Sequence, residues 1–455
     1  MTIAEDIARY VGSVSYRDIP ENVVHAAKVR IIDDIGCAIA GSVSRPATIA
    51  VKSVQESKGP HLSTVLGTKR KTDPSLAAFV NGAMARYLDF NDTYDSKELS
   101  HPSDNIMPVL AVAEAFGRTG KDALLGVVLA YELQCRMCDA ANLWKLGWDH
   151  VIYGLVSVAG AASRLMGLDA GRTTQAINIS LNSHLTMRQL RSGQLSMWKA
   201  PAFSNSARNA IFSATLAMNG MTGPAPVFEG DMGFWKQVTG RFSIDTSRFG
   251  GKRGSFRIKE TLIKQYPAEV RAQAAISSAL EARKAIGSVN RIKSIEIGTN
   301  EAGWKIIGKG YEKWHPKTKE TADHSLPYVV AVSLLDGKIT TASYSDSKLK
   351  DSKVASLMGK TTVVERKEYT KLFNNGGTVN AADVVIRMSD GRTVKKKCIY
   401  SKGHPRNPMD DSDIEEKFMG LAVPRIGRDK SRRLLKTVWS LEDVKDISKL
   451  LSIVS

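Results

Sequence analysis

The chain has 455 residues, too many for one simple hydrophobic core, so two domains are the natural expectation. Its formal net charge of +18 attracts anions, either nucleic acid or acidic metabolites. The lysines and arginines are scattered, and they lack the interleaved aromatic side chains of a base-stacking surface. The sequence therefore favours a basic solvated surface, and we expect no nucleic-acid partner.

The N-terminal segment predicts an amphipathic helix. Ile3, Ile7 and Tyr10 recur with the helical period, and Glu5 precedes any long apolar run. This pattern is typical of neither a secretory signal nor an acid-poor transit peptide. The longest charge-free stretches, such as 151–163, are too short to span a bilayer. We therefore expect a cytoplasmic protein with no membrane segment.

The pattern stays helical to about residue 220. Apolar residues with a helical period predict further helices over 23–39, 77–88, 105–116, 123–137 and 173–182. Cys135 and Cys138 fall inside a helical stretch, and no third nearby cysteine completes a zinc or iron–sulfur set. We expect free or buried thiols, with no metal and no other cofactor.

After Pro267 the sequence pattern changes from helical to a mixture of helix and strand. Alternating polar and apolar residues predict strands, and an Asp-Gly pair predicts a hairpin turn. The predicted elements are a helix over 269–285, a strand over 291–297, a helix over 325–335, and hairpin strands over 384–388 and 393–400. From residue 411 the helical pattern returns.

These segments predict a mostly α protein with an α+β part. A large all-helical domain is formed by both chain ends, residues 1–260 and 402–455, and residues 261–401 form a smaller inserted α+β lid domain. Two crossings, near 256–264 and 401–404, would join the domains. Such a double connection predicts a hinge with a cleft between the domains.

The segment 87–105 is the most informative about function. If the preceding helix continues to Thr93, Asp89, Asp92 and Thr93 share one face near its C-terminus. A loop with His101 follows, and the next helix begins with a terminus that favours anions. Acidic groups, an imidazole and an anion site suit proton transfer on a carboxylate substrate. The alternative is a capped helix with a solvated polar loop, and this segment alone leaves both open.

Other segments add ionisable side chains near the predicted cleft. A histidine at a helix start suits a general acid or base, and a lysine beside a tryptophan suits a substrate carboxylate. Each also has a structural reading, as a packed histidine, a surface lysine or an acid in a first helical turn. Their common location near the cleft favours function. These candidates are His150, Lys199, Lys264, Glu269, His324 and Tyr328.

Several motifs together resemble the MmgE/PrpD family, which includes 2-methylcitrate dehydratase and cis-aconitate decarboxylase. The matching segments keep one order along nearly the whole chain: 89–93, 101–105, 193–199, 320–325 and 403–408. The resemblance implies a helical domain with an α+β lid and usually a homodimer. It also implies chemistry that needs neither a metal ion nor an iron–sulfur cluster.

The resemblance further implies a pocket. The decarboxylase branch lines its pocket at positions matching Asp89, Thr93, His101, His150, Lys199, Lys264 and Tyr328. It has a histidine where this chain has Glu269, and the 322–328 run here resembles the dehydratase branch. We therefore expect a metal-independent hydro-lyase acting on a small tricarboxylate, which dehydrates 2-methylcitrate, or also citrate, to the cis-aconitate product. The alternatives are a cis-aconitate decarboxylase-like lyase and, from another class, a basic nucleic-acid-binding helical protein.

Dehydration of such an acid requires a base, an acid for the leaving oxygen, and cations for the carboxylates. We assign His150 as the base and His101, held by Asp92, as the acid, with Tyr328 as a second candidate acid. The expected catalytic set is Asp89, Asp92, His101, His150 and Tyr328. The expected substrate-binding set is Thr93, Lys199, Lys264, Glu269 and His324.

Overall fold

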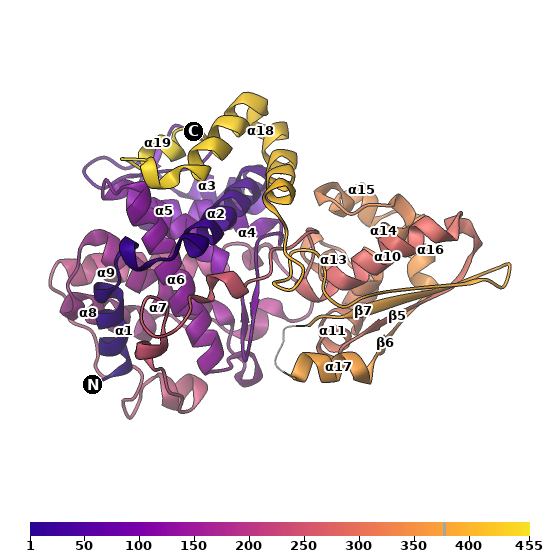
Figure 1. Ribbon diagram of the computed structural model, residues 1–455, viewed down its shortest axis with the longest axis horizontal. Coiled ribbons are helices and arrows are strands. Elements are labelled where there is room, and N and C mark those ends of the chain that lie inside the picture. Colours follow the sequence, from indigo (N-terminus) through magenta and orange to yellow (C-terminus); the bar gives the residue numbers. More distant parts are fainter. Residues whose placement is uncertain (376–378) are drawn as a thin grey trace.

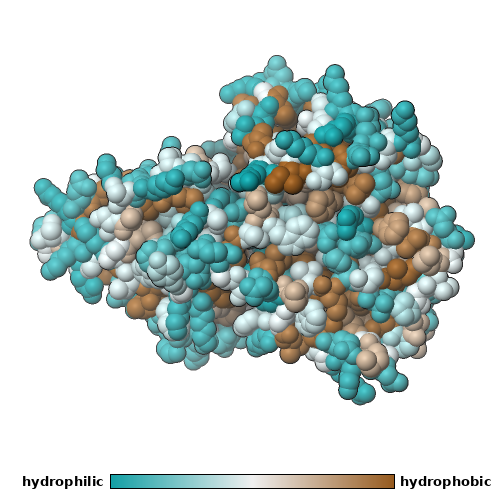
Figure 2. Space-filling view, turned by 180° about the vertical axis from the view of Figure 1, so that it is seen from behind, coloured by the Kyte–Doolittle hydropathy of each residue, from teal (hydrophilic) through white to brown (hydrophobic). Residues whose placement is uncertain are grey.

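The computed structural model describes residues 1–375 and 379–455. Figure 1 shows a broad helical body that contains both chain ends and a smaller lid that contains the main sheet. The space-filling view from behind shows the same division, with hydrophilic side chains predominating at the narrow end formed by the lid (Figure 2). The mostly helical fold with an α+β part is thus confirmed.

The helical body is built from amphipathic and fully buried helices. Helix α1 begins with a capping box, in which Thr2 and Glu5 satisfy each other's backbone N–H groups. Helix α2 is buried almost throughout and packs against α4, α6 and α18. The helices of this body are α1 (Ile3–Ser13), α2 (Glu21–Gly41), α3 (Arg45–Ser53), α4 (Pro74–Tyr87), α5 (Ile106–Ala115), α6 (Gly120–Ala140), α7 (Gly154–Met166), α8 (Ala170–Ser183) and α9 (Ala202–Met218). Two short ribbons pair β1 (Ser63–Thr64) with β2 (Lys71–Thr72) and β3 (Tyr94–Asp95) with β4 (Leu99–Ser100).

The C-terminal helices pack against the helical body. Helix α18 (Asp411–Trp439) lies along α2, and α19 (Ser448–Leu451) follows (Figure 1). Lys417 of α18 is nearly buried and forms an ion pair of 2.6 Å with Asp33 of α2. Its Nζ also donates to the carbonyl oxygens of Phe90 and Lys264, each at 2.8 Å. One side chain of the returning helix therefore holds both segments that lead to the candidate site.

The lid contains a four-stranded sheet in the order β6-β5-β7-β8. Strand β5 pairs with β6 in parallel and with β7 antiparallel, and β7 and β8 form the predicted hairpin. Strand β6 has no counterpart in the sequence prediction. The strands are β5 (Ile292–Thr299), β6 (Thr361–Glu365), β7 (Ala382–Met388) and β8 (Thr393–Cys398). The helices are α10 (Gln273–Ile286), α11 (Glu301–Gly303), α12 (Tyr311–Trp314), α13 (Lys319–Ala322), α14 (Leu326–Asp336), α15 (Asp346–Leu349), α16 (Ser352–Gly359) and α17 (Lys367–Asn374).

The body and the lid have separate hydrophobic cores. The core of the body includes Ile263, and the core of the lid begins at Ala268. The two predicted crossings lie side by side, because the N–H of Ile263 donates to the carbonyl of Gly403 at 3.0 Å. Division of the chain at 260 and 401 stays our proposal. Among the helices of the described residues, none is long and apolar enough to cross a membrane.

Candidate active site

A cavity of about 1140 Å³ lies where the body meets the lid. Its wall combines acidic, basic and imidazole groups from the body, from the start of the lid and its 301–324 region, and from the 404–406 segment. Most of the ionisable residues that the sequence singles out contribute to it. Those that line the cavity are Asp89, His101, His150, Lys264, Glu269 and His324.

Asp89 owes its position to the end of helix α4. The helix ends at Tyr87, and Asp89 adopts a left-handed conformation with a φ of 53°. Aspartate tolerates this conformation better than most residues do. The expectation that the helix continues to Thr93 is therefore wrong, and Asp89, Asp92 and Thr93 do not share a helical face. The turn directs Asp89 toward cations of both the body and the lid.

Asp89 is the centre of a buried ion-pair cluster. Its carboxylate contacts Arg86, Lys264 at 2.9 Å and Lys199 at 3.4 Å. Lys264, which is 0% exposed, also donates to the carbonyl of Asp89 at 2.9 Å. Burial opposes ionisation of Asp89, but its cationic neighbours hold the pKa of the carboxyl well below its ordinary value. Asp89 is thus a permanent anion that links the body to the lid.

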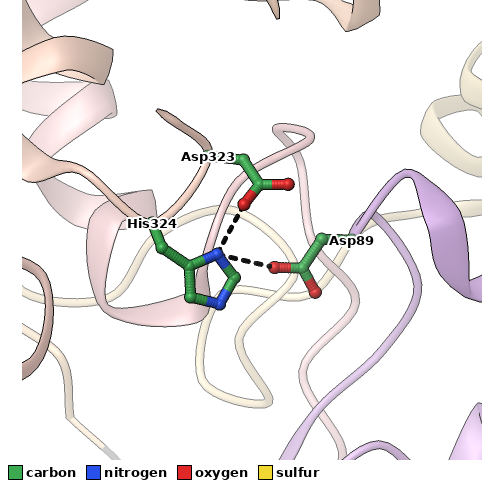
Figure 3. Close-up of side chains that lie close together, drawn as sticks. All are labelled: Asp89, Asp323 and His324. Carbon is green, nitrogen blue, oxygen red and sulfur yellow. Dashed lines mark hydrogen bonds and ion pairs between the residues drawn. The ribbon is translucent and has the colours of Figure 1, made fainter. Parts of the chain in front are cut away.

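His324 and Asp323 complete the cluster from the lid side. His324 Nδ1 contacts an Asp323 oxygen and lies 3.7 Å from an Asp89 oxygen (Figure 3). Asp323 also pairs with Lys319 at 2.6 Å and with Lys199 at 3.7 Å. Burial and the neighbouring Lys199 lower the pKa of His324 to about 4, so it is neutral near pH 7.

The same three residues have ligand atoms close enough for a metal ion. Atoms of Asp89, Asp323 and His324 lie within 4.8 Å of one another. However, both carboxylates are already paired with lysines or arginine, which would repel a divalent cation. The electrostatics of this cluster therefore suit ammonium groups better than a metal.

Two neutral histidines face each other in the wall of the body. The rings of His101 and His150 are 5.4 Å apart and nearly perpendicular. His101 Nδ1 lies 2.8 Å from the carbonyl oxygen of Asp92, so it carries the proton, and the unprotonated Nε2 has no protein partner among the described residues. Burial, with Arg86 and Lys264 nearby, lowers the pKa of His101 well below its ordinary value.

His150 is held by a carboxylate and an arginine. Its Nε2 lies 3.2 Å from Arg191 Nη2, so Nε2 accepts, and its Nδ1 lies 3.5 Å from an Asp149 oxygen. Asp149 is fully buried and also pairs with Arg188 at 3.2 Å. Burial lowers the pKa of His150 well below its ordinary value, the arginines lower it further, and Asp149 opposes them.

Four expected site residues have other roles in the structure. The Asp92 carboxylate accepts from the N–H of Ser103 at 2.9 Å and faces Arg30, so Asp92 holds His101 through its carbonyl and not through its carboxylate. Thr93 lies behind His101, with its hydroxyl 3.2 Å from the ring. Neither residue lines the cavity.

Tyr328 and Glu269 also differ from expectation. The Tyr328 hydroxyl donates to the carbonyl of Ser343 at 2.7 Å inside the lid, and the residue does not line the cavity. Glu269 lines the cavity, but its carboxylate accepts from the Arg271 side chain and backbone, each at 2.6 Å. It also caps a short turn that precedes α10, so the α-helix begins at Gln273 and not at Glu269 as the sequence predicted. Glu269 therefore orients Arg271.

Sequence reasoning missed several charged residues of the site. Arg86 precedes Asp89 by three positions, the spacing of an ion pair on a helix, and Asp323 adjoins the selected His324. Asp149 adjoins the selected His150 in the same way. The arginines of the 188–191 turn gave no local signal, because their partner lies about 40 positions earlier.

Comparison with known families now decides the relationship. The model of the MmgE/PrpD N-terminal domain matches residues 5–247, and that of the MmgE/PrpD C-terminal domain matches residues 266–443. The chain belongs to the MmgE/PrpD family. The 2-methylcitrate dehydratase of Cupriavidus necator is 30% identical over 400 residues, covering 83% of this chain and 81% of that protein.

Two further relatives represent both branches of the family. The 2-methylcitrate dehydratase of Salmonella typhimurium is 28% identical over 438 residues, covering 91% of this chain and 88% of that protein. Human cis-aconitate decarboxylase is 26% identical over 469 residues, covering 100% of this chain and 94% of that protein. The similarity to both extends across the body and the lid.

Proposed function

We propose that this member of the MmgE/PrpD family is a hydro-lyase that dehydrates 2-methylcitrate to 2-methyl-cis-aconitate, with citrate as a further substrate. Relatives named 2-methylcitrate dehydratase match most of the chain. The observation that carries the proposal is a cavity that combines two neutral histidines with buried cations. Such a site can remove a carbon-bound proton from a bound polycarboxylate.

The hydrogen bonds support a change in the expected roles of the histidines. His101 is neutral with its proton on Nδ1, so its Nε2 is ready to accept a proton from the substrate. We therefore propose His101 as the base, where the sequence suggested the acid. His150, predicted as the base, stays a second candidate base, because Arg191 occupies its Nε2 in the absence of a ligand. The leaving hydroxyl needs a proton, and Lys264 lines the cavity as an ammonium whose pKa is lowered by burial.

Decarboxylation of cis-aconitate is a second candidate activity, because human cis-aconitate decarboxylase matches the full length of the chain. The ion pair between Glu269 and Arg271 argues against it. The family resemblance gives the decarboxylase branch a histidine at the position of Glu269. A neutral histidine there would leave Arg271 unpaired and change the charge of the wall.

We further propose that the reaction needs no metal and that the enzyme is a cytoplasmic homodimer. The support for the first part is the pairing of Asp89 and Asp323 with cations of the protein. The dimer rests on the family resemblance alone. Light scattering of the purified protein measures its mass, and a monomer at micromolar concentration would contradict this part of the proposal.

The test is turnover by purified protein with a panel of 2-methylcitrate, citrate and cis-aconitate. Ultraviolet absorbance follows the conjugated product of dehydration, and released carbon dioxide reports decarboxylation. We expect dehydration at the same rate with and without a chelator. Decarboxylation alone, no turnover of any panel member, or turnover restored only by added metal would each contradict the proposal.

Two variants and one control assign the histidines. His101→Asn and His150→Asn should each lower kcat by about a hundredfold or more, the usual effect of losing a general acid or base. His315→Asn is the matched control, because His315 is exposed on the lid and does not line the cavity. A His101 variant with nearly normal kcat would remove His101 from the mechanism.

A further inference from the structure

An arginine pair beside His150 shares the carboxylate of Asp149. Arg188 and Arg191 both line the cavity, and both pair with the single carboxylate of Asp149. His150 is neutral, so Asp149 alone does not offset both arginines, and burial raises the pKa of Glu98, another carboxyl of the cavity wall, to about 7, so it is only partly ionised near neutral pH. Apart from its bond to Asp149, the guanidinium of Arg188 has no hydrogen-bond partner among the described residues, and its side chain is 28% exposed. These features suit an anionic ligand.

Arg191 contacts both Asp149 and His150. Its Nε and Nη2 donate to the Asp149 carboxylate at 2.7 Å and 3.3 Å, and the same Nη2 lies 3.2 Å from the Nε2 lone pair of His150. The contact with His150 is the one that a ligand would alter. While this contact exists, the lone pair of His150 cannot accept a proton from a substrate. A carboxylate is a stronger acceptor for a guanidinium than a neutral imidazole is, because charge-assisted pairs are about twice as strong.

The segment that carries these arginines is attached to both parts of the molecule. On the side of the body, the N–H of Arg188 donates to the carbonyl of Gly147 at 2.8 Å. On the side of the lid, the N–H of Leu195 donates to the Thr321 hydroxyl of α13 at 3.2 Å. Gly193, with a φ of 67°, lies between the two attachments. The arginines therefore lie where a ligand that touches both parts would meet them.

We propose that Arg188 and Arg191 form a carboxylate-binding subsite, and that a bound carboxylate draws Arg191 away from His150 and thereby frees the lone pair of Nε2. Asp149 is a positioning residue that keeps both arginines beside the ring. The inference rests on the proposed function, because it names the group that would bind one carboxylate of the tricarboxylate substrate. It also explains a difference between the two neighbouring rings: without a ligand, Nε2 of His101 has an available lone pair, whereas Nε2 of His150 contacts Arg191.

The surroundings of His150 define what a titration of this residue would report. Several charged or titratable groups act on its ring. They are Asp149 beside it in the chain, Arg188 and Arg191 of the following turn, Arg86 of α4, and His101. Loss of Arg191 removes one positive charge and one donor, so the pKa of His150 should rise.

Binding of tricarballylate tests the subsite without turnover, because this tricarboxylate has no hydroxyl to lose. In calorimetry we expect Arg191→Gln and Arg188→Gln each to weaken binding about tenfold to a hundredfold, the effect of losing a charged hydrogen bond. Arg188→Gln leaves the contact between Arg191 and Asp149 in place, so it tests the subsite even if Arg191→Gln fails to fold. Arg172→Gln, on the exposed surface of α8, is the control and should bind as the native protein does.

Nitrogen-15 spectra of the histidine rings test the release of His150, with the His150→Asn variant assigning its signals. We expect tricarballylate to shift the Nε2 signal of the native protein, and Arg191→Gln to show a similar shift without ligand. Native affinity in both arginine variants, or an Nε2 signal that does not respond to bound ligand, would overturn the proposal. If arginine-dependent binding occurs but 2-methylcitrate is not turned over, the subsite stands and the proposed function fails.

Discussion

Replacement of Asp89 by asparagine removes the charge that joins the body to the lid while keeping the shape of the side chain. The carboxylate contacts Arg86, Lys264 at 2.9 Å and Lys199 at 3.4 Å, and Lys264 has no exposed surface. Each such pair is worth about 4 kcal/mol at an effective dielectric of 20, and desolvation of the carboxylate offsets part of this sum. Uncompensated buried cations remain, so we expect Asp89→Asn to lower the free energy of unfolding by about 3 to 5 kcal/mol at pH 7.

The pH dependence of this loss gives a second measurement. The folded-state pKa of Asp89 lies well below its ordinary value, so its stabilising contribution is complete above about pH 4 and disappears as the pH falls toward the folded-state pKa. The difference between native and variant protein should therefore be largest at neutral pH and shrink in acid. Urea denaturation followed by tryptophan fluorescence at several pH values measures it.

The matched control is Glu281→Gln on α10, where the carboxylate pairs with Lys284 and both side chains are more than half exposed. We expect no measurable change in stability, because exposed pairs contribute little. A loss of less than about 1 kcal/mol for Asp89→Asn, or a loss of equal size at pH 3 and pH 7, would refute the account of Asp89 as a buried anion that binds the two parts together.

Three further expectations follow from single contacts. Burial lowers the pKa of Lys199 to about 8, so a supporting charge on Lys199 predicts that kcat/KM falls above pH 8. Lys199→Arg should shift this fall in the pH profile of kcat/KM to higher pH, and an unchanged profile would contradict the role. Tyr328→Phe should keep nearly native kcat and lose about 1 kcal/mol of stability, since its hydroxyl bonds Ser343; a hundredfold loss of kcat would restore it as an acid. Gly403→Ala should lower the melting temperature, because the new Cβ would lie 1.8 Å from the carbonyl oxygen of Ile263 and Gly403 has a φ of 91°. A native melting temperature would show that the backbone can move there.

Local patterns were enough to predict most of the fold. The amphipathic helix α1, the periodic helices of the body, and the hairpin at Gly391 depend on neighbouring residues, so they can be recognised in a short window. Strand β6 was not predicted. It has five residues and forms through pairing with β5, more than 60 positions earlier. Its environment is therefore set by the tertiary fold and not by its own sequence.

Part of the cavity wall follows from the sequence motifs, and its geometry does not. His101, His150 and Lys264 meet in one cavity, as the motifs indicate. The left-handed turn at Asp89 and the inward bond of Tyr328 were not foreseen, because each depends on partners that the sequence does not place. Packing fixes the direction of a side chain at a helix end. A family motif therefore indicates which residues are candidates for the site, but it does not indicate the role of each.

The attachment of Lys417 has a consequence for how the protein is made. All residues up to 410 are synthesised before α18, yet α18 covers α2 and supplies the ammonium that holds Phe90 and Lys264. A nascent chain therefore lacks the cover that α18 gives to one side of α2 during most of translation, when domains usually begin to fold. A gene fragment that ends after the first family segment, at residue 247, would yield a polypeptide that lacks this cover and leaves Asp33 without its Lys417 partner.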